Sequence, residues 1–167
     1  MVSKLSELCE YSLKKIQVGQ LNLTNYISTD NMLPNKGGII SANSLPAELM
    51  TQAYSKGNVL ISNIRPYFKK IWLADRDGGC SNDVLVFVAK KGVDEAYLYY
   101  LLSCDDFFNY SMAMSKGTKM PRGDKIALMN YVVQSKNIDE QRRIAAILHS
   151  LDAKIKINKT INDNLAA

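Results

Sequence analysis

The chain has 167 residues and a formal net charge of +5, with 47% hydrophobic and 22% charged residues. This composition supplies enough apolar side chains for a buried core and excludes an intrinsically disordered chain. No apolar run approaches the about 20 residues that a membrane-spanning helix needs, and the positive charge favours a polyanionic partner.

Strands and turns are predicted along the first half of the chain. Residues 1–58 form an irregular, polar start, because the stretch "NYISTDNMLPNKGGI" groups Asn, Asp, Pro and Gly as turn signals. Apolar runs at 59–61 and 71–73 predict two short strands, and Pro66 excludes a central strand between them. A third strand is predicted over 84–89, where consecutive apolar residues indicate burial on both faces. Three strands this close together predict a small sheet.

Helical periodicity begins after Asp94, which is a suitable N-cap. The periodicity breaks near Cys104 and Asp105, so two helices are expected. One face of the first helix carries Ala96, Tyr97, Tyr100 and Leu101. A short strand is predicted over 128–134, after the intervening loop.

A final helix is predicted from residue 138 to the end of the chain, without Pro or Gly. Asn137 and Glu140 have the spacing of a capping box at its start. The predicted fold is therefore α+β: a small twisted β-sheet with packed helices, followed by a long C-terminal helix that can form a coiled coil.

That final helix carries an apolar seam at heptad spacing. Two interpretations stay open: the helix packs on its own domain, or it pairs with another helix. A seam Asn favours pairing, because a buried Asn usually fixes the register between two helices. The seam positions are Ile144, Ile147, Leu148, Leu151, Ile155, Asn158, Ile161 and Leu165.

The sequence offers little that indicates catalysis or a metal site. The single histidine, His149, lies off the helix seam, which predicts a solvated residue. No H-E-x-x-H, G-x-S-x-G or G-x-G-x-x-G motif is present. Acidic residues at Asp75, Asp77 and Asp83 lack the further oxygen ligands of a calcium loop, so solvated acids are expected. An enzyme of another kind stays an alternative.

The cysteines likewise give no indication of a metal site. The chain has three cysteines, at Cys9, Cys80 and Cys104, and no C-x-x-C pair. Their odd number and wide separation argue against a zinc site and against a disulfide framework. Reduced thiols in a cytoplasmic protein are the simplest interpretation.

The stretch "SKGTKMPRGDK" at 115–125 is rich in Gly, Pro and basic residues. It is not a P-loop, because Gly117 and Gly123 are one residue too far apart and Asp124 occupies the lysine position. A mobile surface turn and an anion-facing loop are both compatible with it. A second basic cluster in "SNIRPYFKK" interleaves aromatic residues with cations, which is typical of nucleic-acid surfaces. Two solvated loops far apart are the alternative.

Three longer stretches carry a resemblance to a known family. They are "GNVLISNIRPYFKKIWLADRDGGCSNDVLVF", "SKGTKMPRGDK" and "DEQRRIAAILHSLDAKIKINKTINDNL". In this combination and order they resemble the specificity subunit of type I restriction–modification systems. The resemblance extends to "YISTDNMLPNKGGI" and so covers most of the chain.

The resemblance implies a non-catalytic DNA-recognition adaptor that needs no cofactor of its own. In that family a target recognition domain reads part of a bipartite double-stranded DNA sequence, and a conserved helix spaces it from a second such domain. The subunit docks on modification subunits, which methylate adenine, and restriction subunits also join. By this resemblance, residues 1–137 form the target recognition domain and 138–167 the spacer helix.

The chain departs from the family pattern in having one domain and one spacer helix. A half-size or truncated subunit is therefore expected, and a homodimer through the C-terminal helix would restore two domains. A protein-interaction module without DNA binding of its own is the alternative. The predicted DNA-contacting residues are Asn63, Arg65, Tyr67, Lys69, Lys70, Asn82, Lys116, Gly117, Thr118, Lys119 and Arg122.

Overall fold

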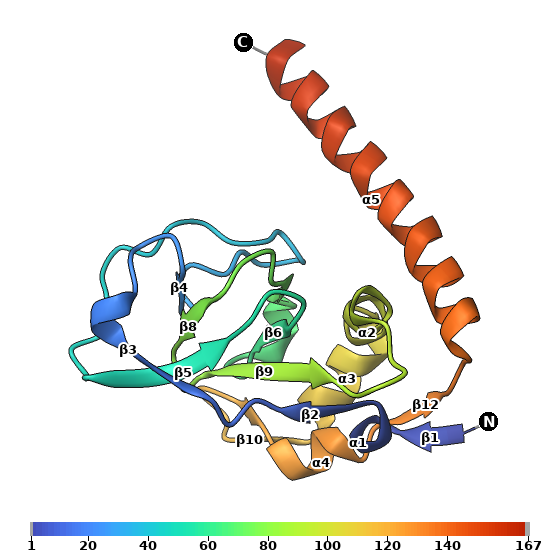
Figure 1. The fold of residues 1–167 in the computed structure, drawn as a ribbon, viewed down its shortest axis with the longest axis horizontal. Coiled ribbons are helices and arrows are strands. Elements are labelled where there is room, and N and C mark those ends of the chain that lie inside the picture. The colour runs from blue at the N-terminus through green and yellow to red at the C-terminus, as the bar shows by residue number, and fades with distance from the viewer. Residues whose placement is uncertain (1, 166–167) are drawn as a thin grey trace.

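Two four-stranded sheets hold most of the strands in the computed structural model, which describes residues 2–165 (Figure 1). The first sheet is antiparallel, and the strands predicted over 59–61, 71–73 and 84–89 lie in it. Its order is β2 (Cys9–Tyr11), β9 (Val84–Ala89), β6 (Val59–Ser62) and β7 (Ile71–Leu73). Pro66 opens a short 3-10 turn, η2 (Pro66–Phe68), between β6 and β7, as its lack of a donor requires.

The second sheet comes mostly from the region that was expected to be irregular. Its order is β3 (Lys15–Gln17), β5 (Met50–Tyr54), β8 (Gly78–Cys80) and β4 (Tyr26–Ile27). The pairs β3–β5 and β5–β8 are antiparallel, and β4–β8 is parallel. The prediction of an irregular start over 1–58 is therefore wrong. These strands have two to five residues and are held by distant partners, so no local apolar pattern reveals them.

Six further elements close the domain around these sheets. The pairs β1 with β12 and β10 with β11 form two small ribbons. Helix α1 and the 3-10 turn η1 lie early in the chain. The bounds are β1 (Val2–Lys4), α1 (Leu5–Leu8), η1 (Val18–Gln20), β10 (Ser115–Lys116), β11 (Arg122–Gly123) and β12 (Val132–Gln134).

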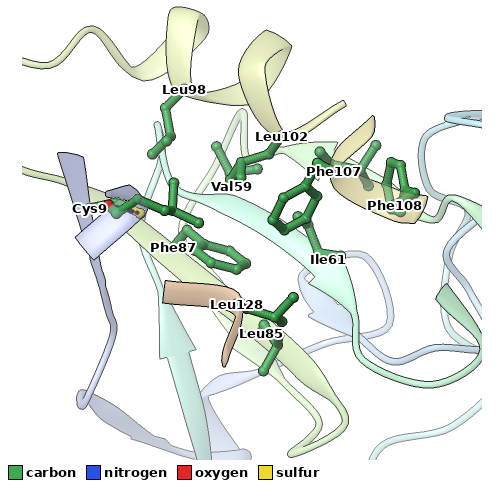
Figure 2. Close-up of a cluster of buried hydrophobic side chains, with 12 residues drawn as sticks. Cys9, Val59, Ile61, Leu85, Phe87, Leu98, Leu102, Phe107, Phe108 and Leu128 are labelled. Carbon is green, nitrogen blue, oxygen red and sulfur yellow. Dashed lines mark hydrogen bonds between the residues drawn. The ribbon is translucent and has the colours of Figure 1, made fainter. Parts of the chain in front are cut away.

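Both faces of the first sheet are buried. Side chains alternate along β6 and β9, so Ile61 and Phe87 face the helices while Leu60 and Val86 face the second sheet. The predicted burial of the 84–89 strand on both sides is confirmed for Val84–Phe87. Figure 2 shows the helix-side cluster, in which Leu98 and Leu102 lie above the sheet and Phe107 and Phe108 close one end.

Helices α2 (Glu95–Leu102) and α3 (Asp105–Ala113) confirm the predicted break near Cys104 and Asp105. Asp94 caps α2 as predicted, because its side chain accepts a hydrogen bond from the Tyr97 amide at 2.9 Å. The predicted face of α2 packs on the final helix. The opposite face also is buried, through Leu98 and Leu102 in the core.

The predicted strand over 128–134 begins too early. Residues 128 and 129 belong to a short helix, α4 (Lys125–Met129), and β12 covers only the last three residues. The reason is local: the Asp124 carboxylate accepts hydrogen bonds from the amides of Ile126 (3.0 Å) and Ala127 (3.1 Å) and so begins a helix. Leu128 then points into the core beside Leu85 (Figure 2).

The final helix, α5 (Ile138–Leu165), docks on the domain as far as Asp152 and then projects away from it (Figure 1). The capping box is confirmed: the Glu140 amide donates to Asn137 Oδ1 at 2.9 Å, and the Asn137 amide donates to Glu140 Oε2 at 3.4 Å. Gln141 and Ala145 are buried against α2. Residues 166 and 167, assigned to the same helix by sequence, lie outside the described residues.

The helix-side core predicts one strongly destabilising substitution. Phe107 is 1% exposed, and its ring contacts those of Phe87, Phe108 and Tyr131. We expect Phe107→Ala to lower the free energy of unfolding by about 3–5 kcal/mol, because the cavity adds to the lost transfer free energy. Urea unfolding measures this. Leu13→Ala is the control, since Leu13 is 92% exposed, and a similar loss in both variants would contradict the core assignment.

Candidate nucleic-acid interface

The basic stretch at 115–125 is a β-hairpin that ends in the cap of α4. Ser115 pairs with Gly123 and Lys116 with Arg122. Gly117 has a φ of 93°, a left-handed conformation that favours glycine at the hairpin turn. The tip residues Gly117–Met120 are exposed. The stretch expected as a surface turn or an anion-facing loop is thus a hairpin with a solvent-facing tip.

The two predicted basic clusters lie side by side. The amide of Arg65 donates to the carbonyl of Pro121 at 2.8 Å, and Ile64 forms a β-bridge with Arg122. The amide of Gly123 donates to the carbonyl of Asn63 at 3.3 Å. The alternative of two basic loops far apart is therefore wrong. We call the hairpin 115–123, the turn 65–70 and the adjoining Lys36 the basic face.

Two acids next to the basic face each hold a cation in place. Arg122 lies 3.1 Å from Asp83, and Lys116 lies 2.8 Å from Asp124. The hydrogen bond from Lys116 lowers the pKa of the Asp124 carboxyl, and the amides of Ala127 and Ile126 add to this. The pairs are partly exposed, so they order side chains more than they stabilise the fold. Anionic ligands would compete with these carboxylates for the same cations.

Asp105 links two separate segments of the face. Its carboxylate lies 2.9 Å from the Lys69 ammonium and 3.3 Å from that of Lys36. The hydrogen bond from Lys69 and then that from Lys36 lower the pKa of Asp105. The link is therefore present at neutral pH and is lost only as the pH falls through that lowered pKa, when the carboxyl takes up a proton.

The predicted contact residues do not all reach the surface. The exposed ones include Tyr67, Asn82, Thr118 and Lys119. Asn63 is buried behind the face. A Cβ atom on Gly123 would lie 2.8 Å from its Oδ1. Internal packing therefore favours glycine at position 123.

Lys70 is only partly available. Its ammonium donates a hydrogen bond to the carbonyl of Thr29 and lies 5.7 Å from the centroid of the Phe68 ring. Lys70 thereby ties the turn 65–70 to the segment before Asn31. We expect it to position the turn more than to contact a ligand.

Sequence reasoning missed a second basic region. A cleft of about 300 Å³ lies between the β2–β3 connection and the start of α4, and it is lined by Lys14, Lys15 and Lys125. Asn82 and Gln52 add amide groups. Asn82 precedes Asp83, which pairs with Arg122 of the hairpin, and Lys125 follows Asp124, which pairs with Lys116. The cleft therefore adjoins the hairpin. The Lys14–Lys15 pair was the available signal, and the "PNKGG" turn was the signal for Lys36.

The remaining titratable groups give no second site. His149 is exposed on α5, as predicted. Asp75 pairs with Arg76, and Asp77 accepts a hydrogen bond from the Lys56 amide at 2.7 Å. Within residues 2–165, no group of three His, Cys, Asp or Glu side chains is arranged to hold a metal ion. No helix in this part of the chain is long and apolar enough to span a membrane.

The cysteines are free thiols in two different environments. Cys9 and Cys80 are buried, and burial raises the pKa of each to about 12. Both therefore stay protonated and unreactive at neutral pH. Cys104 is exposed beside α3.

The apolar seam of α5 is exposed beyond the docked segment. Leu151 is 49% exposed and Ile155 53% exposed. Ile144 and Leu148 are partly buried, and Ile144 packs against the apolar cluster that joins α5 to α2. The last described contact with the domain is the hydrogen bond from the Tyr100 hydroxyl to Asp152, at 2.9 Å. The first part of the seam thus packs on its own domain, and pairing of the exposed part stays a prediction.

Comparison with known proteins identifies a family over the whole chain. The family model "Type I restriction modification DNA specificity domain" matches residues 1–167. The specificity subunit of the type I restriction enzyme EcoDI from Escherichia coli is 28% identical over 111 residues, which are 66% of this chain and 24% of that protein. The family expected from the sequence is confirmed.

Solved structures share the fold. The HsdS subunit from Thermoanaerobacter tengcongensis matches with a TM-score of 0.71 and 22% identity over 96% of this chain and 44% of its own. A chain from a study of the assembly and conformational transition of the type I R-M system matches with a TM-score of 0.74 and 23% identity, over the same shares. An S subunit from M. genitalium gives 0.65 and 13%, over 93% and 40%. The chain spans less than half the length of these proteins.

Proposed function

Because the chain belongs to the type I restriction modification DNA specificity domain family, we propose that it binds double-stranded DNA and reads one part of a bipartite target. In this proposal residues 1–137 form the target recognition domain and residues 138–167 the spacer helix. The domain directs an adenine methyltransferase, and restriction subunits where present, to its site in the cytoplasm. The family is one of specificity domains, so the methyl transfer belongs to the partner.

The observation that carries the proposal is the continuity of the basic face. The Arg65–Pro121 hydrogen bond joins two cation-rich segments that are far apart in sequence. Exposed Lys119, Thr118 and Tyr67 lie on these segments, and neither 65–70 nor 115–123 contains an acidic residue. Cations neutralise phosphates, and hydroxyl, amide and aromatic groups contact sugars and bases.

The exposed seam of α5 supports docking of a helical partner. Modification subunits and a second copy of this chain are both suitable partners for such a seam. A module that only binds protein, without DNA, would use the same seam and leave the basic face unused.

Binding of a fluorescent random duplex pool tests the proposal. If at least three phosphates are neutralised, affinity should fall roughly 40-fold or more between about 50 and 200 mM salt, because bound counterions are released. Fluorescence anisotropy at several salt concentrations gives the slope, and a single-stranded pool of equal length is the control. Absence of salt-dependent duplex binding would favour the protein-interaction module.

A further inference from the structure

Four non-glycine residues adopt left-handed backbone conformations in the described part of the chain. They are Asn35 (φ 53°), Lys36 (φ 60°), Arg65 (φ 50°) and Lys69 (φ 50°). Asn tolerates this region, but for Arg and Lys it costs free energy because Cβ crowds the backbone. Such residues persist only where the surrounding structure holds them, and they concentrate at functional sites.

These four residues occupy one place on the surface. The amide of Asn35 donates to the carbonyl of Phe68 at 2.8 Å, and the amide of Lys36 donates to that of Lys69 at 2.9 Å. Asp105 bridges the two lysines from the start of α3. The segment 35–36 and the turn 65–70 thus hold each other through these bonds. The turn is therefore ordered before any ligand binds.

Arg65 has a hydrogen-bonding group that the domain leaves unsatisfied. Its Nε is buried and has no hydrogen-bond partner among residues 2–165. The side chain lines a hollow of about 220 Å³ together with Lys70, Asp30 and Met120. An unsatisfied buried donor is costly, so an acceptor that lets the guanidinium swing outward would be favoured.

Two aromatic rings stand outside this turn. Tyr67 is 48% exposed and Phe68 39% exposed, and their ring centroids are 4.7 Å apart. Pro66 is buried beneath them and fixes the backbone. The hairpin 115–123 differs from this turn because it contains no aromatic residue. Its exposed tip carries the flexible side chain of Lys119 and the small side chain of Thr118.

Resting on the proposed function, we propose that the two halves of the basic face have separate tasks: the Arg65–Lys69 turn reads base edges, and the hairpin holds phosphates. Arg65 is the specificity-determining residue, and its guanidinium takes a guanine through O6 and N7. Tyr67 supplies apolar contact with the neighbouring base. A rigid, strained turn suits base readout because little conformational entropy is lost on binding, whereas phosphate contacts need only charge within reach.

Two substitutions at Arg65 separate this role from a structural one. Arg65→Lys keeps the charge but cannot make the paired hydrogen bonds of the guanidinium fork. Arg65→Asn suits the left-handed backbone better, so its unfolding midpoint should be unchanged or higher. Lys119→Ala is the phosphate-contact control. All three are compared with wild type in the full-length chain, by selection from a random duplex pool and by anisotropy at several salt concentrations.

Both Arg65 variants should lose the preference for guanine at one position, by roughly tenfold to a hundredfold. The Arg65→Lys variant should keep the wild-type salt slope. The Lys119→Ala variant should weaken all sequences alike and flatten the slope by about one. If both Arg65 variants select the wild-type sequences, this inference is overturned while the proposed function stands. Failure of the wild type to bind duplex DNA would refute both.

Discussion

Replacement of Lys116, Lys119 and Arg122 together by alanine should lower affinity for duplex DNA by up to about 500-fold at 0.1 M salt. The three side chains are exposed on the hairpin 115–123. Each phosphate that a cation neutralises releases a counterion, so three lost contacts should flatten the log–log salt slope by up to about three. Anisotropy titrations with one duplex at five or more salt concentrations give both quantities.

The matched control removes the same charge elsewhere. Lys154, Lys156 and Lys159 are exposed on α5, away from the basic face, and their triple alanine variant should keep the wild-type slope. The hairpin variant leaves Asp83 and Asp124 without their cations, but both pairs are partly exposed, so the unfolding midpoint should hardly change. A wild-type salt slope in a folded hairpin variant would remove the hairpin from the interface.

Leu151→Asp should abolish self-association of the chain. Leu151, Ile155 and Ile161 are half-exposed along the part of α5 that leaves the domain. Pairing of two such seams buries apolar surface, at roughly 25 cal/mol per Å². About four turns of seam give a small interface, so micromolar association is expected. An unpaired carboxylate in that seam is costly to bury.

Sedimentation velocity over a concentration series checks this expectation. His149→Asp is the control, since His149 is exposed on the same helix outside the seam and should leave association unchanged. Asn158→Leu should strengthen association while loosening helix register. If the wild type and Leu151→Asp proteins both sediment as monomers at high micromolar concentration, the seam serves a different partner.

The sequence predicts what local chemistry decides. The caps at Asp94 and Asn137 were predictable because each satisfies an amide within three residues. The 84–89 strand was predictable because continuous apolar residues fit burial on both faces. Strand β8 was not, since Gly78 and Gly79 carry no apolar signal and depend on partners from β4 and β5.

In the candidate site, too, some features were predictable from the sequence and others depended on the tertiary fold. The cation-rich composition of both clusters was visible in the sequence, but their contact through Arg65 and Pro121 joins residues that only the tertiary fold brings together. Burial of Asn63 behind Gly123 likewise depends on that contact. The Lys14–Lys15 cleft was missed because its walls come from four separated segments.

Pairing of β1 with β12 makes the chain enter and leave the recognition domain at one corner (Figure 1). Val2 lies opposite Gln134, and Leu8 packs with Val133 and with Ala145 of α5. The direction of α5 is therefore set at this corner, by residues that do not belong to the turn at Arg65. If the turn at Arg65 reads bases as proposed, its residues can change without altering the contacts that set the direction of α5.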